Sequence, residues 1–141
     1  MEEIRSSFLR KLFHFIRNYE GQHPNIRDIF SPEAIDFLLM ESIKSEDQIN
    51  SKAFIDFVIK TGYKDEPTVD VDDKPLLYRT TPVHSSFRRA SLKCDSRIPS
   101  LFEVYNRFDV NYIDESGLTH FHVACMIQGC DEIVEKFLEL G

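Results

Sequence analysis

Near the end of the chain, two histidines and two cysteines lie close enough in sequence to suggest metal chemistry. His120 and His122 flank Phe121, and Cys125 and Cys130 follow. Imidazole nitrogens and thiolates are ligands that zinc prefers, and four of them can close a structural site. The same side chains could instead support a helix turn or fill small apolar positions. We expect the structural role, with no metal or cofactor, and keep an adventitious zinc ion as the alternative.

No arrangement of residues predicts an enzyme. The sequence has no Gly-rich phosphate loop, no nucleophile elbow and no isolated Cys–His pairing. The aspartates between Lys64 and Pro75 are dense enough to suggest calcium, but the alternating ligands, central glycine and terminal glutamate of a calcium loop are missing. We therefore predict a protein without catalytic activity.

Composition and charge restrict the partners. The 141 residues suffice for one domain or a short elongated array, and 42% of them are hydrophobic. A net charge of -7 opposes nucleic-acid binding, which needs a basic surface. No segment reaches the roughly 20 apolar residues of a membrane span, and the three cysteines form no CxxC pair. We expect a cytoplasmic protein that binds neither nucleic acid nor membrane, with the nucleus as the alternative location.

Helical periodicity dominates the first half of the chain. Apolar residues recur at helical spacing from Ile4 to Ile16, which predicts a first helix. An amphipathic segment at this place could also be a mitochondrial presequence, but Glu2 and Glu3 fit such a signal poorly. A second helix is expected after the SPE pattern that begins at Ser31, and a third ends before a glycine at position 62. The side chains expected to face inward are Ile35, Leu38, Leu39 and Ile43, then Phe54, Ile55, Val58 and Ile59.

An internal repeat connects two stretches of the second half. TTPVHSSF and LTHFHVAC align so that Thr81 and His84 of the first copy match Thr119 and His122 of the second. Both copies resemble the ankyrin motif T-P-L-H-x-A. In that motif a threonine caps the first helix of the repeat, and a histidine three residues later supports the same turn.

The resemblance extends beyond the motif itself. Pro82 takes the place of the motif's proline, Ala124 that of its small residue, and Gly117 and Gly141 those of the turn and closing glycines. VNYIDESG resembles the turn that leads into an ankyrin repeat, and DEIVEKFLEL resembles its second helix. The specific resemblance therefore covers residues 80–141.

The two copies also depart from the ankyrin pattern. They are 38 residues apart, from Thr81 to Thr119, against about 33 for a standard repeat. We place an insertion in SLKCDSRIPS, in the first copy, which also lacks the expected glycine. His120 replaces the proline of the second copy, and the residues that replace the usual alanines of the first are Ser85, Ser86 and Phe87.

The resemblance implies an all-α fold, an ankyrin-type helical solenoid with an N-terminal helical cap. The expected parts are an N-terminal helical region at 1–30, a helical hairpin and degenerate repeat at 31–63, an acidic extended loop at 64–79, a repeat with an insertion at 80–111, and a repeat at 112–141. Because the closing glycine of a repeat ordinarily leads into another, we expect further repeats beyond Gly141, with self-association as the alternative.

The resemblance also implies a function, that of a non-enzymatic protein–protein interaction module acting as a scaffold or adaptor. Its partners would be other proteins. The acidic turn residues expected to contact them are Asp70, Asp72, Asp73, Asp114 and Glu115.

A regulated adaptor or kinase substrate is the alternative function. RRASL, at residues 88–92, has the two basic residues, spacer, serine and apolar residue that basophilic kinases favour. A phosphate on Ser91 would add nearly two negative charges beside Arg88 and Arg89.

Overall fold

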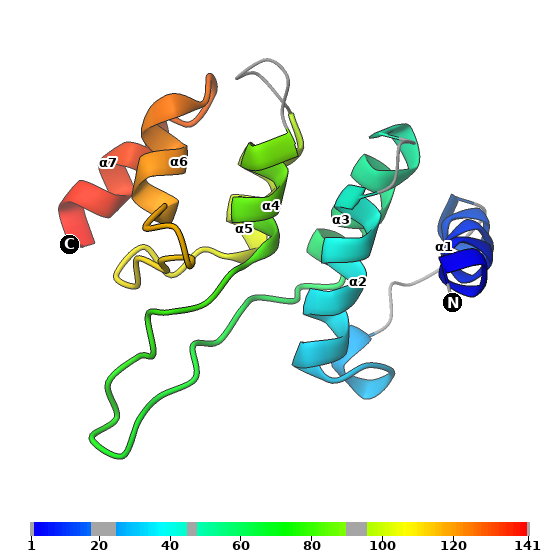
Figure 1. Ribbon diagram of the computed structural model, residues 1–141, viewed down its shortest axis with the longest axis horizontal. Coiled ribbons are helices and arrows are strands. Elements are labelled where there is room, and N and C mark those ends of the chain that lie inside the picture. Colours follow the sequence, from blue (N-terminus) through cyan, green and yellow to red (C-terminus); the bar gives the residue numbers. More distant parts are fainter. Residues whose placement is uncertain (1, 18–24, 45–47, 90–95, 141) are drawn as a thin grey trace. The chain divides into compact units, whose positions relative to one another are not determined.

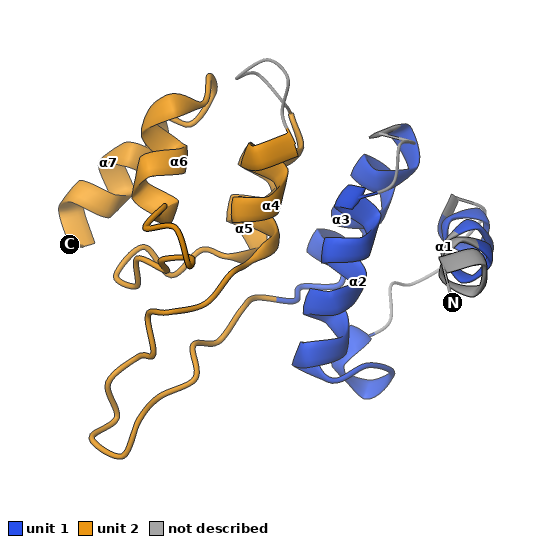
Figure 2. Ribbon diagram, viewed as in Figure 1, with its two compact units in different colours: residues 1–63 blue, residues 64–141 orange. Residues whose placement is uncertain are grey.

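We analysed a computed structural model that describes residues 2–17, 25–44, 48–89 and 96–140 (Figure 1). Within these ranges the chain forms seven α-helices and one short 3₁₀ helix, and the β-structure consists of isolated bridges. The all-α prediction is confirmed. The chain divides into two compact units, 1–63 and 64–141, which are described separately (Figure 2).

The first unit is a small cluster of helices. Both outer helices of the cluster, α1 and α2, pack on α3. Phe13 of α1 is buried, with its ring centroid 6.2 Å from that of Phe54. The helices are α1 (Glu2–Arg17), η1 (Ile26–Asp28), α2 (Pro32–Lys44) and α3 (Gln48–Lys60).

The helix boundaries of the first unit follow local chemistry. Ser31 caps α2, since its Oγ accepts a hydrogen bond from the Ala34 N–H over 3.2 Å. Gly62 follows α3 with a φ of +82°, a left-handed conformation that glycine adopts without strain. All four side chains expected to face inward in α2 are buried, as are three of the four in α3; Ile59 is half-buried.

The second unit contains two helical hairpins. They are α4 (Pro82–Arg89) with α5 (Arg97–Val104), and α6 (His120–Met126) with α7 (Asp131–Leu140). The two helices of each hairpin pack on each other, and α4 also packs on α6. The first helices of the two hairpins are therefore neighbours.

The sequence did not reveal α5. It begins inside SLKCDSRIPS, the segment to which the insertion was assigned, and residues 91–95 of that segment lie outside the described residues. Pro99 occupies the first turn of α5, where the missing N–H costs no helical hydrogen bond. Ile98, Leu101 and Phe102 are buried by this helix.

A loop precedes the first helix of each hairpin. We call residues 64–79 the first finger and residues 112–119 the second finger. An antiparallel bridge between Val69 and Pro75 makes the first finger a short β-hairpin, which is more regular than the extended loop we expected. Figure 1 shows it projecting away from the helices of its unit. A parallel bridge between Tyr78 and Ile113 joins the two fingers.

The last helix is only partly covered. α7 buries Phe137 and leaves Leu138 and Leu140 exposed. The expectation of further repeats, or of self-association, stays a prediction.

Ser86 of α4 is a polar residue in the core of the second unit. Its side chain is fully buried, and its Oγ has no hydrogen-bond partner among the residues that the structure describes. A buried polar atom without a partner costs about 1–3 kcal/mol. The position is one of those at which the ankyrin pattern favours alanine.

We predict that Ser86→Ala raises the free energy of unfolding by about 1 kcal/mol, because it removes the unpartnered hydroxyl and little volume. Urea denaturation measures the change. Ser42→Ala is the matched control: the Ser42 hydroxyl is also buried but donates to the Leu39 carbonyl oxygen over 2.8 Å, so its removal should destabilise the protein. A loss of stability in Ser86→Ala would contradict the prediction.

Candidate interaction surface and its buried anchor

A threonine and a histidine cap the start of α4. The Thr81 N–H donates to Nδ1 of His84 over 3.0 Å, and the Val83 N–H donates to Thr81 Oγ1 over 3.2 Å. Because Nδ1 accepts a hydrogen bond, the neutral ring carries its proton on Nε2, which lies 3.3 Å from the Tyr112 carbonyl oxygen. His84 thus ties the first turn of α4 to the base of the second finger.

The start of α6 has a similar Thr–His cap, in which the N–H of the histidine itself, three residues on, donates to the threonine. The His122 N–H donates to Thr119 Oγ1 over 3.0 Å, and the Thr119 N–H donates to His122 Nδ1 over 3.2 Å. His122 is exposed, whereas His84 is fully buried. Of the other motif residues, Pro82 is the first residue of α4, Ala124 is buried in α6, and Gly141 lies outside the described residues.

His120 connects the two copies. It is 1% exposed, and its Nε2 lies 2.6 Å from Thr81 Oγ1. Its ring centroid is 4.8 Å from that of His84 and 5.3 Å from that of Tyr112. We call Thr81, His84, Tyr112 and His120 the histidine anchor. Through it, one buried hydrogen bond joins the start of α4 to the start of α6.

The residues of the zinc alternative differ in their surroundings. His120 and Cys130 are buried, while His122 and Cys125 are exposed. Burial, together with the charge of Asp131, raises the pKa of the Cys130 thiol to about 11. Across the described ranges, no group of three or more His, Cys, Asp or Glu side chains is placed to hold a metal ion.

Burial keeps the anchor histidines neutral. Loss of solvent lowers the pKa of His84, although the nearby Asp114 carboxylate partly opposes the shift. Burial also lowers the pKa of His120 well below its ordinary value, and the charges of His84 and Arg79 act in the same direction. Protonating either ring would place a charge where little solvent can reach it.

Asp114 organises the turn of the second finger. Its Oδ1 accepts hydrogen bonds from the N–H groups of Ser116 and Leu118, each over 3.0 Å. Gly117, within this turn, has a φ of +93°. These bonds satisfy backbone donors that a tight turn would otherwise leave unpaired.

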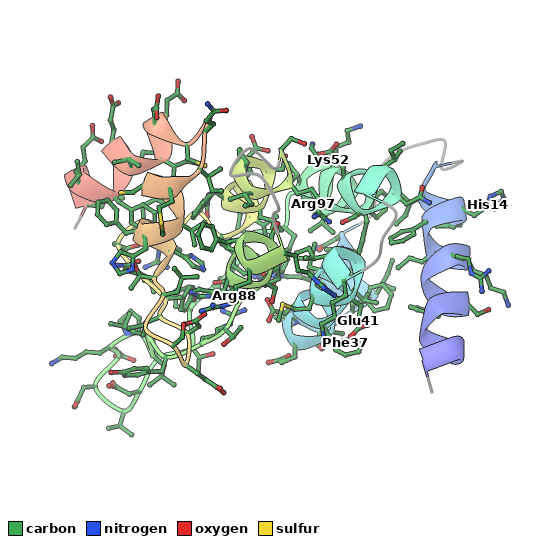
Figure 3. The ribbon with its side chains drawn as sticks, turned by 45° about the horizontal axis from the view of Figure 1, so that its top comes forward. His14, Phe37, Glu41, Lys52, Arg88 and Arg97 are labelled. Atoms are coloured by element: carbon green, nitrogen blue, oxygen red, sulfur yellow. The ribbon has the colours of Figure 1, made fainter. Side chains whose placement is uncertain are left out.

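Asp114 also holds Arg88, which Figure 3 labels on α4. The Arg88 guanidinium donates to Asp114 Oδ2 from Nη2 over 2.6 Å and from Nε over 3.2 Å, and it also donates to the Ser116 hydroxyl. Burial raises the pKa of Asp114, but hydrogen bonds from Arg88, Ser116 and the backbone outweigh it and leave that pKa well below its ordinary value. Asp114 does not fit the expected partner contact, because the residue is 6% exposed and both of its carboxylate oxygens already accept hydrogen bonds.

The turn of the first finger has the same pattern of aspartate hydrogen bonds as the turn of the second, but it contains no glycine. Asp70 Oδ1 accepts hydrogen bonds from the N–H groups of Asp72 and Lys74, over 2.8 and 3.0 Å. Asp73 has a φ of +59° and takes the place of Gly117; aspartate tolerates this conformation better than most residues. Matching D-V-D-D to D-E-S-G would have revealed the correspondence in the sequence. Asp70, like Asp114, therefore has a structural role.

A second buried cluster fixes the base of the first finger. Asp65 is 4% exposed and accepts hydrogen bonds from the Tyr112 hydroxyl over 2.8 Å and from Arg79 Nη1 over 2.9 Å. Burial and the Asp65 carboxylate raise the pKa of Tyr112 well above its ordinary value. Sequence reasoning missed these residues, because Asp65 lies in an acidic run that predicts solvent exposure.

The remaining acids and the kinase motif are placed differently. Asp72, Asp73 and Glu115 are exposed. Ser91 lies outside the described residues, and Arg88 of the same motif is held by Asp114. A kinase that recognises Arg88 would have to compete with that ion pair, and the regulated alternative stays a prediction.

No family model, curated protein or solved structure matches this chain. In the part of the chain that the structure describes, no helix is long and apolar enough to cross a membrane. The class of the protein must therefore be argued from its own residues, which form two hairpins with matching Thr–His caps and matching finger turns.

We predict that acid destabilises the protein through the histidine anchor. Unfolded histidines bind protons near pH 6.5, whereas the folded chain keeps both rings neutral below that pH. The stability that the two neutral rings contribute is thus fully present above pH 6.5. It is lost as the pH falls below that value, by up to about 1.4 kcal/mol per pH unit for each ring.

Urea denaturation at pH 7 and pH 5, above the range in which carboxyl groups mostly titrate, measures this loss. His120→Gln should reduce the pH dependence, because it removes one of the two buried rings. Equal stability of the unmodified protein at both pH values would contradict the prediction.

Proposed function

We propose that the protein is a non-enzymatic protein–protein interaction module, a scaffold or adaptor in which two ankyrin-type repeats follow an N-terminal helical unit. The observation that carries this proposal is the repetition of one structural unit in the same order: finger, Thr–His cap, first helix and second helix. The packing of α4 on α6 supports it as well, because repeat proteins build a shared core between neighbouring units.

The use of the polar residues supports binding rather than catalysis. His84, His120, Asp65 and Asp114 are buried and bonded to neighbours within their unit, so each has a structural partner. The exposed groups at the finger tips are mainly carboxylates, which repel the phosphates of nucleic acid. A protein partner suits this surface best.

Site-specific photocross-linking tests the proposal in cells that express the protein. We expect a photoreactive residue to capture partner protein from position 115 on the second finger and position 125 on α6. The same group at position 135 on α7 should capture little. Glu115, Cys125 and Glu135 are all exposed and belong to one unit, so they form a matched set.

The design separates recognition from nonspecific contact. Equal capture from all three positions would indicate contact without a preferred surface. Capture from position 135 alone would place the partner on the second helices. Either result would contradict an interaction module that uses its fingers and first helices.

A further inference from the structure

Backbone pairing determines which side chains of the first finger share a face. The bridge between Val69 and Pro75 is flanked by two backbone hydrogen bonds of 2.8 and 2.9 Å, so these two residues lie opposite each other on one side of the hairpin. Side chains two residues apart in an extended chain point to the same side. Pro67 and Leu77 therefore extend the face that Val69 and Pro75 begin.

This face is apolar and largely exposed, although Pro67 and Pro75 are half-buried. Val69 is 47% exposed, Leu77 is 44% exposed, and Val71 at the tip is 99% exposed. We call Pro67, Val69, Val71, Pro75 and Leu77 the finger face. Figure 3 shows side chains leaving both sides of this finger. Large apolar side chains gathered on an exposed surface are typical of an interaction site.

Unpaired acids border the finger face. Asp72 and Asp73 are exposed, and their carboxylates make no hydrogen bond or ion pair with any residue in the described ranges. Asp70 already performs the structural task of the turn. The two neighbouring carboxylates thus remain available to pair with cations of another molecule.

The finger is held firmly enough to present this face. At its base, Asp65 is bonded to Tyr112 and Arg79, and the Arg79 N–H and Leu77 carbonyl oxygen pair with Ile113 over 3.0 and 2.8 Å. A surface that is ordered before binding loses less conformational entropy when a partner arrives.

The finger is poorly suited to accept an added strand. In the pair formed by Val69 and Pro75, the backbone groups point outward, away from the opposite arm. Pro75 has no N–H to offer there, and Pro67 on the other arm has none either. This geometry favours contact through side chains over extension of the hairpin.

We propose that the first finger binds a basic amphipathic segment of another protein. The apolar side chains of that segment pack on the finger face, and its Lys or Arg side chains pair with Asp72 and Asp73. This inference rests on the proposed function as an interaction module and specifies the chemistry of its partner.

Two synthetic helical peptides test the inference with the full chain. They share one pattern of leucines and differ in carrying either lysine or glutamate at the polar positions. In ¹⁵N nuclear magnetic resonance titrations, the lysine peptide should shift the amide signals of residues 66–78, and its affinity should fall as salt is added. The glutamate peptide should leave those signals unchanged.

Matched variants separate the two parts of the contact. Asp72→Asn combined with Asp73→Asn removes both charges and keeps residues that tolerate a left-handed turn, and Val71→Ser removes an apolar contact. Each variant should weaken lysine-peptide binding by about threefold to tenfold. The controls Glu135→Gln and Leu138→Ser change an exposed acid and an exposed leucine of α7, and should keep the affinity within about twofold.

Three results would overturn the inference: no binding of the lysine peptide, equal binding of both peptides, or signal shifts confined to residues outside the first finger. None of these results bears on whether positions 115 and 125 capture a partner in cells. Failure of the finger inference and failure of the proposed function are therefore distinguishable.

Discussion

The hydrogen bond between Thr81 Oγ1 and His120 Nε2 joins residues 39 positions apart and lies where little solvent reaches. Both groups are polar and buried, so each depends on the other to avoid the cost of an unpaired polar atom. The bond forms only when the caps of α4 and α6 are both in place. It therefore favours folding of the two copies as one cooperative unit and sets the spacing of their first helices.

Tyr112 carries this constraint from the helices to the fingers. Its carbonyl oxygen lies 3.3 Å from His84 Nε2 and accepts a hydrogen bond from the backbone N–H of His120 over 3.1 Å. Its hydroxyl donates to Asp65. One residue thus connects the histidine anchor to the base of the first finger. The position of the finger face, and with it the proposed partner surface, follows from the anchor.

Local signals in the sequence predicted the parts of the fold that depend on local chemistry. Helical spacing identified the buried side chains of α2, and the motif spacing paired Thr81 with His84. Contacts across the chain were not predictable: Asp114 meets Arg88 26 residues away, and Asp65 meets Tyr112 47 residues away. Each acid lies in a polar run that predicts solvent exposure, because no periodic pattern indicates which distant residue will cover it.

A double-mutant cycle on Thr81 and His120 tests the central claim most directly. Urea denaturation would give the unfolding free energies of the unmodified protein, Thr81→Val, His120→Leu and the double variant. If the bond couples the two copies, the summed losses of unfolding free energy in the two single variants should exceed the loss in the double variant by about 1 kcal/mol or more. Additive losses would contradict the account, because they would mean that the two copies are not coupled through these side chains.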